Sequence, residues 1–306
     1  MTATATETIP KARRSTMLGA RIREAGWGYA FVAVPMAVFG LFFIYPFGYM
    51  VYISFRKWGI LGNQGSVGTR NYHDVLNDPI FHTALKNIAE YTIGVVPLAM
   101  ALGLSLALIV NAGLRGRNFF RSAFYFPSIA SSVAIVTIAL YLFKSNGLFN
   151  TTFGFSTPWF TTASTATWAI VGLNGWTTSG TIMLFYLAAL QSIPTEVYEA
   201  AAVDNTSRWR AFWRITFPLL RPAHFFVLVI FGVGALKLFD QPFLVSGGSG
   251  GPNYSTMNPI LYIYTKAFAS GAADFGHAAA AGVVYFVIIF VLTVVARLTV
   301  GRQQSV

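Results

Sequence analysis

Four polar side chains recur inside one long apolar run of this sequence, residues 167–190. They are Asn174, Thr177, Thr178 and Thr181. In a helix this spacing places them on one face, near the middle of the run. Amide and hydroxyl groups at that depth could hydrogen-bond the hydroxyls of a polar solute. Side chains of this kind also join helices within a membrane bundle, so a solute path and an interhelical contact both remain open.

A second constellation combines opposite charges in another apolar run. Lys237 and Asp240 lie three residues apart within residues 223–245. On one helix they would share a face and could pair, and an unpaired charge inside a membrane is costly. The pair is either structural or part of a solute path, together with Gln241. Asn87, close to Tyr91, could line the same path.

Residue patterns typical of catalysis and cofactor binding are missing from the sequence. The four histidines have no metal-ligand spacing, and neither a Ser-His-Asp order nor paired catalytic carboxylates stand out. The glycine-rich run 247–251 lacks the Gly-Lys-Ser/Thr ending of a phosphate-binding loop. We therefore predict a non-enzymatic chain that binds no cofactor. Any ATP-driven process would need ATP and magnesium on separate subunits.

A polar stretch, residues 194–222, separates two apolar runs and predicts two short helices joined by a sharp turn. Thr195 can cap the first helix, and Thr206 or Ser207 the second. Asn205 tolerates the left-handed conformation that the turn requires. Pro218 is expected to end the second helix.

The first of these helices has the shape of a docking element. Its three consecutive alanines give it a low profile that fits a groove on another protein, and Glu199, Asp204 and Arg208 add charge at its edges. The alternative is a generic amphipathic surface helix.

The same stretch resembles the cytoplasmic coupling loop of permease subunits in binding-protein-dependent ABC importers. The resemblance rests on Glu199-Ala200-Ala201, Asp204-Asn205, Ile215, and Leu219 to Pro222. The family usually has glycine where this chain has Asn205. The resemblance implies that coupling to a separate ATPase is carried by Glu199, Ala200, Ala201, Asp204, Asn205, Ser207 and Arg208.

Composition favours a polytopic membrane protein. Of 306 residues, 55% are hydrophobic and 10% charged, against about 25% charged in soluble domains. The net charge of +11 is better explained by basic cytoplasmic loops than by a nucleic-acid partner. The chain has no cysteine, which excludes disulfides and thiolate metal sites.

We expect an all-α integral membrane fold with six transmembrane helices and the coupling loop between the fourth and fifth. The predicted spans are residues 28–55, 87–110, 123–143, 167–190, 223–245 and 278–300. Prolines 35, 46 and 97 predict kinks. Residues 1–27 are interpreted as a flexible cytoplasmic tail, and residues 28–306 as the permease domain. Lys and Arg are about twice as frequent on the side of the coupling loop, which predicts both termini in the cytoplasm of a bacterial inner membrane.

Two outer loops resemble the carbohydrate branch of the same permease family. The motifs are Asn71-Tyr72, Asp78-Pro79-Ile80-Phe81 and Gly250-Gly251-Pro252. This resemblance implies a sugar importer that works by alternating access. Its partners would be a second permease subunit (a heterodimer), two ATPase subunits, an extracytoplasmic solute-binding protein and membrane lipid. The alternatives are a permease for glycerol phosphate diesters, amino acids or phosphate, and a membrane enzyme or scaffold.

Overall fold

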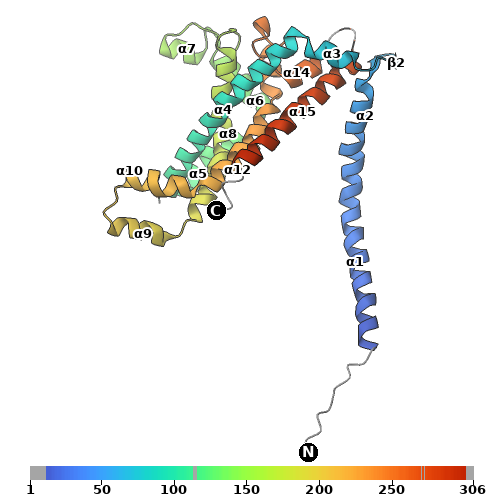
Figure 1. Cartoon of the computed structure of the whole chain (residues 1–306). Helices are drawn as coiled ribbons and strands as arrows, with labels where there is room; N and C mark the ends of the chain where they lie inside the picture. Colours follow the sequence, from blue (N-terminus) through green and yellow to red (C-terminus); the bar gives the residue numbers. More distant parts are fainter. Residues whose placement is uncertain (1–11, 113–115, 270, 272, 301–306) are drawn as a thin grey trace, which may run out of the picture. The chain divides into compact units, whose positions relative to one another are not determined.

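The computed structural model describes residues 12–112, 116–269, 271 and 273–300, and the chain divides into two compact units (Figure 1). Unit 1 covers residues 1–52 and unit 2 covers residues 53–306. The predicted flexible tail lies partly outside the described residues. From residue 12 onward the stretch is helical, because helix α1 (Ala12–Phe39) begins there. Ala, Arg, Met, Leu and Glu in this stretch are good helix formers, so the helix of the apolar run extends into it.

Unit 1 is helical along its described length. α1 continues into a π-helical turn, η1 (Gly40–Ile44), and then into α2 (Tyr45–Ser54). Pro35 lies inside α1 without interrupting it. The wider turn of η1 ends just before Pro46. In a regular helix the ring of this proline would clash with the carbonyl four residues earlier. The Tyr45 N–H accordingly reaches back five residues to the Gly40 carbonyl.

Unit 2 is predominantly helical, as expected, apart from a hairpin that the sequence analysis did not predict. The hairpin pairs β1 (Arg56–Gly59) with β2 (Gly62–Ser66). The helices before the polar stretch are α3 (Arg70–Leu76), α4 (Pro79–Asn111), α5 (Arg117–Ile129), α6 (Ser132–Leu142), α7 (Leu148–Phe153) and α8 (Ala166–Gln191). After it come α12 (Arg221–Leu236), α13 (Asp240–Ser246), η3 (Pro252–Tyr254), α14 (Pro259–Tyr264), η4 (Thr265–Ala269) and α15 (Phe275–Val300).

The centre of unit 2 is the packing of α4 against α8, which Figure 1 shows crossing the unit side by side. Buried Ala99 and Ala107 of α4 meet Ile182 and Met183 of α8. Gly103 makes the close approach possible, because a Cβ there would lie 2.4 Å from Ile182 Cγ2. α5 and α12 also pack against this pair.

Among the described residues, four helical segments are long and apolar enough to cross a membrane. They are Glu24–Ser54, Pro79–Asn111, Arg221–Ser246 and Phe275–Leu298. A fifth results if the bent pair α5 and α6 forms one span. α8 has the length of a span, but it carries the polar stripe predicted for residues 167–190 and buries much of its surface against its neighbours.

The third apolar run is not the single straight span that the sequence predicted. Helices α5 and α6 meet at 92°, with Ala130 extended at their junction (φ −72°, ψ 154°). Pro127 cannot donate a backbone hydrogen bond within α5. Ser131 and Ser132 follow, and serine favours helix starts over helix interiors. The local sequence therefore supports a break at this point.

The fifth run is broken as well, between α12 and α13. In a continuous helix the N–H of residue 242 would bond the Leu238 carbonyl, but residue 242 is proline. Asn258 Nδ2 donates to that carbonyl instead, at 2.8 Å, and the Tyr285 hydroxyl donates to the Leu236 carbonyl. Side chains from distant elements thus replace the missing helical hydrogen bonds.

The polar stretch forms two short helical segments, as predicted. They are α9 (Thr195–Val203) and α10 (Arg208–Ala211), the latter continued by a π-helical turn η2 (Phe212–Thr216) and α11 (Phe217–Leu219). Asn205 is left-handed at φ 51°. The Thr206 N–H bonds the Ala201 carbonyl and the Asn205 N–H bonds the Ala202 carbonyl, which is the Schellman ending of a helix.

Two local predictions for this stretch need correction. Ser207 caps α10 by accepting from the Arg210 N–H, but Thr195 is the first residue of α9 and Pro194 holds the capping position. Pro218 does not end the second helix, because the wider turn η2 precedes it and accommodates its missing donor.

Candidate functional site

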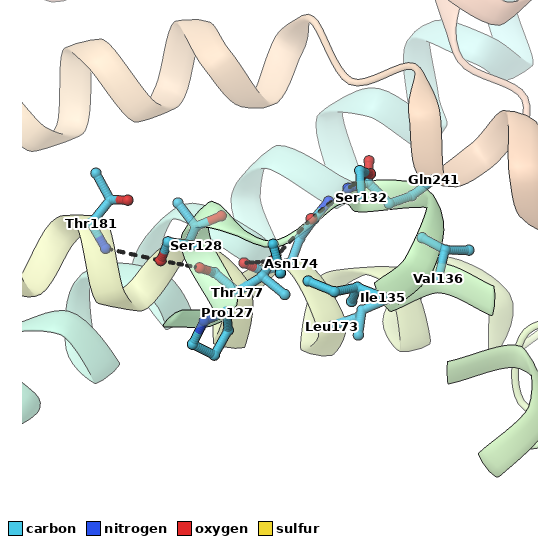
Figure 2. A pocket seen from close by; sticks show the side chains of 12 residues that line it. Pro127, Ser128, Ser132, Ile135, Val136, Leu173, Asn174, Thr177, Thr181 and Gln241 are labelled. Atoms are coloured by element: carbon cyan, nitrogen blue, oxygen red, sulfur yellow. Dashed lines mark hydrogen bonds between the residues drawn. The ribbon is translucent and has the colours of Figure 1, made fainter. Parts of the chain in front are cut away.

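A cavity of about 260 Å³ lies where the break between α5 and α6 faces α8 and the start of α13 (Figure 2). The four polar residues predicted on the fourth run all line it. The polar lining as a whole consists of Ser128, Ser132, Asn174, Thr177, Thr178, Thr181 and Gln241. Ser128 and Ser132 were missed by the sequence analysis. The feature of the sequence that could have identified them is their position on either side of the helix break that Pro127 favours.

Asn174 is the centre of a hydrogen-bond chain that joins separate elements. Its side-chain nitrogen donates to the Tyr91 hydroxyl of α4 at 2.7 Å. Gln241 Nε2 of α13 donates to the side-chain oxygen Oδ1 of Asn174 at 2.9 Å and to the Ser132 hydroxyl at 3.3 Å. Asn174 is 6% exposed, so these contacts fix its orientation.

Ser128 ties the break to α8. Its hydroxyl donates to the Thr177 carbonyl and accepts from the Thr181 N–H. The close approach depends on Gly180, where a Cβ would lie 2.3 Å from the Phe124 carbonyl oxygen of α5.

Several polar groups that line the cavity form no hydrogen bond within the described part of the protein. Within the described part of the chain, the hydroxyls of Thr178 and Thr181 and the side-chain carbonyl of Gln241 have no hydrogen-bond partner. Such groups can donate to or accept from a solute. Figure 2 shows the hydrogen bonds that follow the cavity from the Thr181 N–H to the Gln241 side chain.

A second cavity, of about 230 Å³, lies between α4, α8 and α12. Asn174 and Thr178 line both cavities. Among the described residues that line either one, no side chain is charged at neutral pH. The interior of unit 2 therefore offers hydroxyl and amide groups within an apolar surround.

The remaining predicted path residues lie elsewhere. Asn87 donates to the carbonyls of Tyr254 and Met257, both at 2.8 Å, and so holds the loop that precedes α14. Lys237 and Asp240 are exposed on opposite sides of the helix break and line neither cavity. Among the ion pairs of the described residues, none joins them. The predicted pairing is wrong, because it required one continuous helix.

The motif Asp78-Pro79-Ile80-Phe81 contributes to a polar clamp around Asp78. Its Oδ1 accepts from the Ile80 N–H and caps α4, while Oδ2 accepts from the Tyr262 hydroxyl at 2.6 Å and Lys266 Nζ at 3.1 Å. Burial alone would raise the pKa of the Asp78 carboxyl. The hydrogen bonds from Tyr262 and Ile80 and the charge of Lys266 outweigh burial and hold that pKa below its ordinary value.

Most of the residues assigned to coupling lie on the exposed surface of α9 and the following turn. These are Glu199, Ala200, Asp204, Asn205, Ser207 and Arg208. Ala201 differs, because it is 7% exposed and belongs to the packed side of α9. The Tyr198 hydroxyl lies 3.2 Å from Thr216 Oγ1 and connects α9 to η2. Figure 1 shows α9 and α10 as neighbours at one end of unit 2.

Comparison with known proteins gives matches across most of the chain. The family described as "Binding-protein-dependent transport system inner membrane component" matches residues 99–304. The multiple sugar-binding transport system permease protein MsmF of Streptococcus mutans is 32% identical over 88% of this chain and 93% of its own length. The probable starch degradation products transport system permease protein AmyD of Thermoanaerobacterium thermosulfurigenes is 30% identical over 88% and 92%.

A solved structure shares the fold. It is a bacterial ABC transporter involved in the import of the acidic polysaccharide alginate, with a TM-score of 0.78 at 22% identity, covering 94% of this chain and 99% of its counterpart. A bacterial alginate ABC transporter in complex with an alginate pentasaccharide-bound periplasmic protein gives a TM-score of 0.80 at 23% identity, covering 93% of this chain and 98% of its counterpart. The chain therefore belongs to the family of inner membrane components of binding-protein-dependent transport systems.

Proposed function

We propose that this chain is the permease subunit of an ATP-driven importer of sugars, either oligosaccharides or sugar derivatives. The observation that carries the proposal is the neutral polar cavity around Asn174, which offers hydroxyl and amide groups but no charge. Neutral hydrogen-bonding groups suit a polyhydroxylated solute, whereas a phosphate or an amino acid would favour opposite charges in the lining. The printed names of the relatives support the same solute class.

The proposed topology has six spans, with α8 as the fourth and the bent pair α5 and α6 as the third. A polar helix can cross the membrane when its polar face lines a cavity within the bundle, and Asn174 and Thr178 of α8 meet that condition. Both termini then lie in the cytoplasm, together with α9 and α10.

Alternating access would pass the solute between the two cavities that share Asn174 and Thr178. Opening one side while closing the other requires the elements around Asn174 to shift, and the breaks beside α6 and α13 provide places where they can. Gln241 links these two breaks through Ser132.

Energy would enter through α9. Its exposed face would seat on one of two separate ATPase subunits, which bind ATP and magnesium. The Tyr198–Thr216 contact and the continuous helical run from α10 to α11 would pass the motion to α12. A second permease subunit would complete the path, and an extracytoplasmic solute-binding protein would deliver the solute to the outer loops.

The test is to purify this chain with its ATPase, second permease and solute-binding protein, and to measure ATP hydrolysis with the binding protein empty or loaded. We expect stimulation by one loaded sugar. Stimulation only by a loaded charged non-sugar solute would overturn the sugar assignment. Failure of any ATPase to co-purify would overturn the importer assignment.

A further inference from the structure

The segment that follows the coupling turn carries an exposed face of aromatic and basic side chains. We name it the Trp/Arg face, formed by Trp209, Arg210, Trp213, Arg214 and Phe217 on α10, η2 and α11. Trp209 is 73% exposed and Trp213 is 48% exposed. Large aromatic side chains gathered on a surface usually mark a contact with a partner or a membrane.

The aromatic rings of this face form a continuous row that leads toward the bundle. Ring centroids are 5.7 Å apart between Trp209 and Trp213, and 5.2 Å apart between Trp213 and Phe217. Phe217 in turn lies 4.5 Å from the ring of His224, at the start of α12. The row is therefore anchored at its inner end and exposed at its outer end.

The basic side chains of the face are available to bind anions. Arg210 and Arg214 are four residues apart and both are exposed. In the part of the chain that the structure describes, neither of them has an ion-pair partner. Guanidinium groups bind phosphate through paired hydrogen bonds, and an indole N–H adds a further donor beside them.

The sequence distance to the nearest candidate span limits how far this face can lie from the membrane. The apolar segment Arg221–Ser246 begins eight residues after Trp213, so the two are separated by at most about 12 Å of helix. The headgroup region on each side of a bilayer is roughly 5–8 Å thick. Tryptophan and arginine are enriched in this layer.

We propose that the Trp/Arg face binds the anionic phospholipid headgroups of the leaflet that holds α9, and thereby fixes the height of the coupling helix above the membrane. The aromatic rings enter the acyl boundary and the two guanidinium groups bind lipid phosphates. Because Tyr198 joins α9 to η2, a lipid contact on η2 also positions α9. This contact is separate from the proposed solute path and ATPase surface.

The depth of the face can be measured with spin labels, since the chain has no native cysteine. The variant Trp209→Cys is labelled in the assembled importer in nanodiscs, with Asp74→Cys on α3, an exposed position outside the proposed ATPase surface, as the control. We expect the label at 209 to collide more with oxygen than with a water-soluble nickel chelate, by several-fold relative to 74. Equal exposure to the nickel chelate at both positions would overturn the proposal.

The alternative occupant is the ATPase subunit. The two occupants, lipid and ATPase, are distinguished by repeating the measurement on the permease pair without ATPase. Protection of residue 209 in lipid alone supports the headgroup assignment. Protection that appears only when ATPase is added would assign the face to the ATPase and overturn the proposal.

The charge requirement is tested with Arg214→Gln and Arg214→Lys, against Arg297→Gln near the end of α15 as the control. Stimulated ATP hydrolysis is compared in zwitterionic nanodiscs and in nanodiscs with about a third anionic phospholipid. We expect anionic lipid to raise the wild-type rate, with the effect reduced up to about fivefold in Arg214→Gln and retained in Arg214→Lys. An equal reduction in Arg297→Gln, or suppression of the lipid effect by millimolar inorganic phosphate, would contradict a headgroup site on this face.

Discussion

The side-chain nitrogen of Gln241 lies 2.9 Å from the side-chain oxygen of Asn174, so a hydrogen bond joins α13 to the middle of α8. The same Gln241 amide reaches Ser132 at the start of α6. Three elements that the sequence places in different spans thus meet at one carboxamide pair. Asn174 lines two of the cavities of unit 2, so in the proposed function this contact is the place where solute binding and helix arrangement would affect each other.

Replacing Asn174 should therefore impair transport more than assembly. Asn174→Leu removes the hydrogen bonds to Tyr91 and Gln241, at about 1 kcal/mol each. We expect sugar uptake in vesicles to fall about tenfold or more while the complex still purifies. The control is Thr83→Val, at an exposed hydroxyl whose bond is to its own helix. Unchanged uptake by Asn174→Leu would remove the main argument for the solute path.

Gly180 and Gly172 give a matched pair on α8. A Cβ at Gly180 would overlap the Phe124 carbonyl, whereas a Cβ at Gly172 has nothing within 4 Å. Gly180→Ala should destabilise by about 1–3 kcal/mol, as overpacking does. Gly172→Ala should be neutral. The melting temperatures of the two purified variants report their stabilities. Similar values would mean that α5 and α8 can separate enough at Gly180 to accept a Cβ.

Asn205 needs its left-handed conformation. Asn205→Ala should cost about 1 kcal/mol, while Asn205→Gly should keep the turn. If α9 is the docking helix, coupled uptake should fall in the alanine variant and persist in the glycine variant. Hydrogen exchange at residues 205 and 206 reports whether the turn has opened. Equal uptake in both variants would show that the conformation of this turn does not affect coupling.

Asp204 tests the coupling assignment directly. It is exposed beside Asn205, so its substitution should leave the fold intact. We expect Asp204→Lys to uncouple ATP hydrolysis from uptake in the assembled complex, with Asp74→Lys on α3, also exposed, as the charge-matched control. Full transport by Asp204→Lys would leave the docking assignment without its main support.

The Asp78 clamp predicts a pH dependence. Because the folded-state pKa of Asp78 is lowered, its carboxylate contributes stability above its unfolded pKa, and this contribution is lost as the pH falls through the folded value. Asp78→Asn should therefore lower stability by about 1–2 kcal/mol at neutral pH and by less near pH 3. Melting temperatures of both forms between pH 3 and 7 check this. A constant difference across that range would show that the carboxylate charge is not what matters.

Local chemistry predicted the polar stretch well. Asn205 adopts the left-handed turn and Ser207 caps α10, because each depends on its immediate neighbours. The polar stripe on α8 was also predictable, since helical periodicity alone places Asn174 and Thr178 together. The extent of α1 was not predictable. The helix propagates into residues 12–27, whose polar composition had suggested a flexible tail.

The break in the fifth run could not be predicted, because the hydrogen bonds at this break are completed from far along the chain. The Leu238 carbonyl is bonded by Asn258, and the Leu236 carbonyl by Tyr285. Only the prolines were visible in the sequence, and proline is tolerated in membrane helices that remain continuous. The pairing predicted for Lys237 and Asp240 failed for this reason.

Asn258 has a further consequence for how α14 and the interruption between α12 and α13 can move. Its Oδ1 accepts from the Leu261 N–H at the start of α14, while its Nδ2 holds the Leu238 carbonyl, and the side chain is buried. One amide therefore joins the start of α14 to the interruption between α12 and α13. A displacement of α14 is passed directly to that interruption, and any motion that separates the two must break the hydrogen bond from Asn258 to the Leu238 carbonyl.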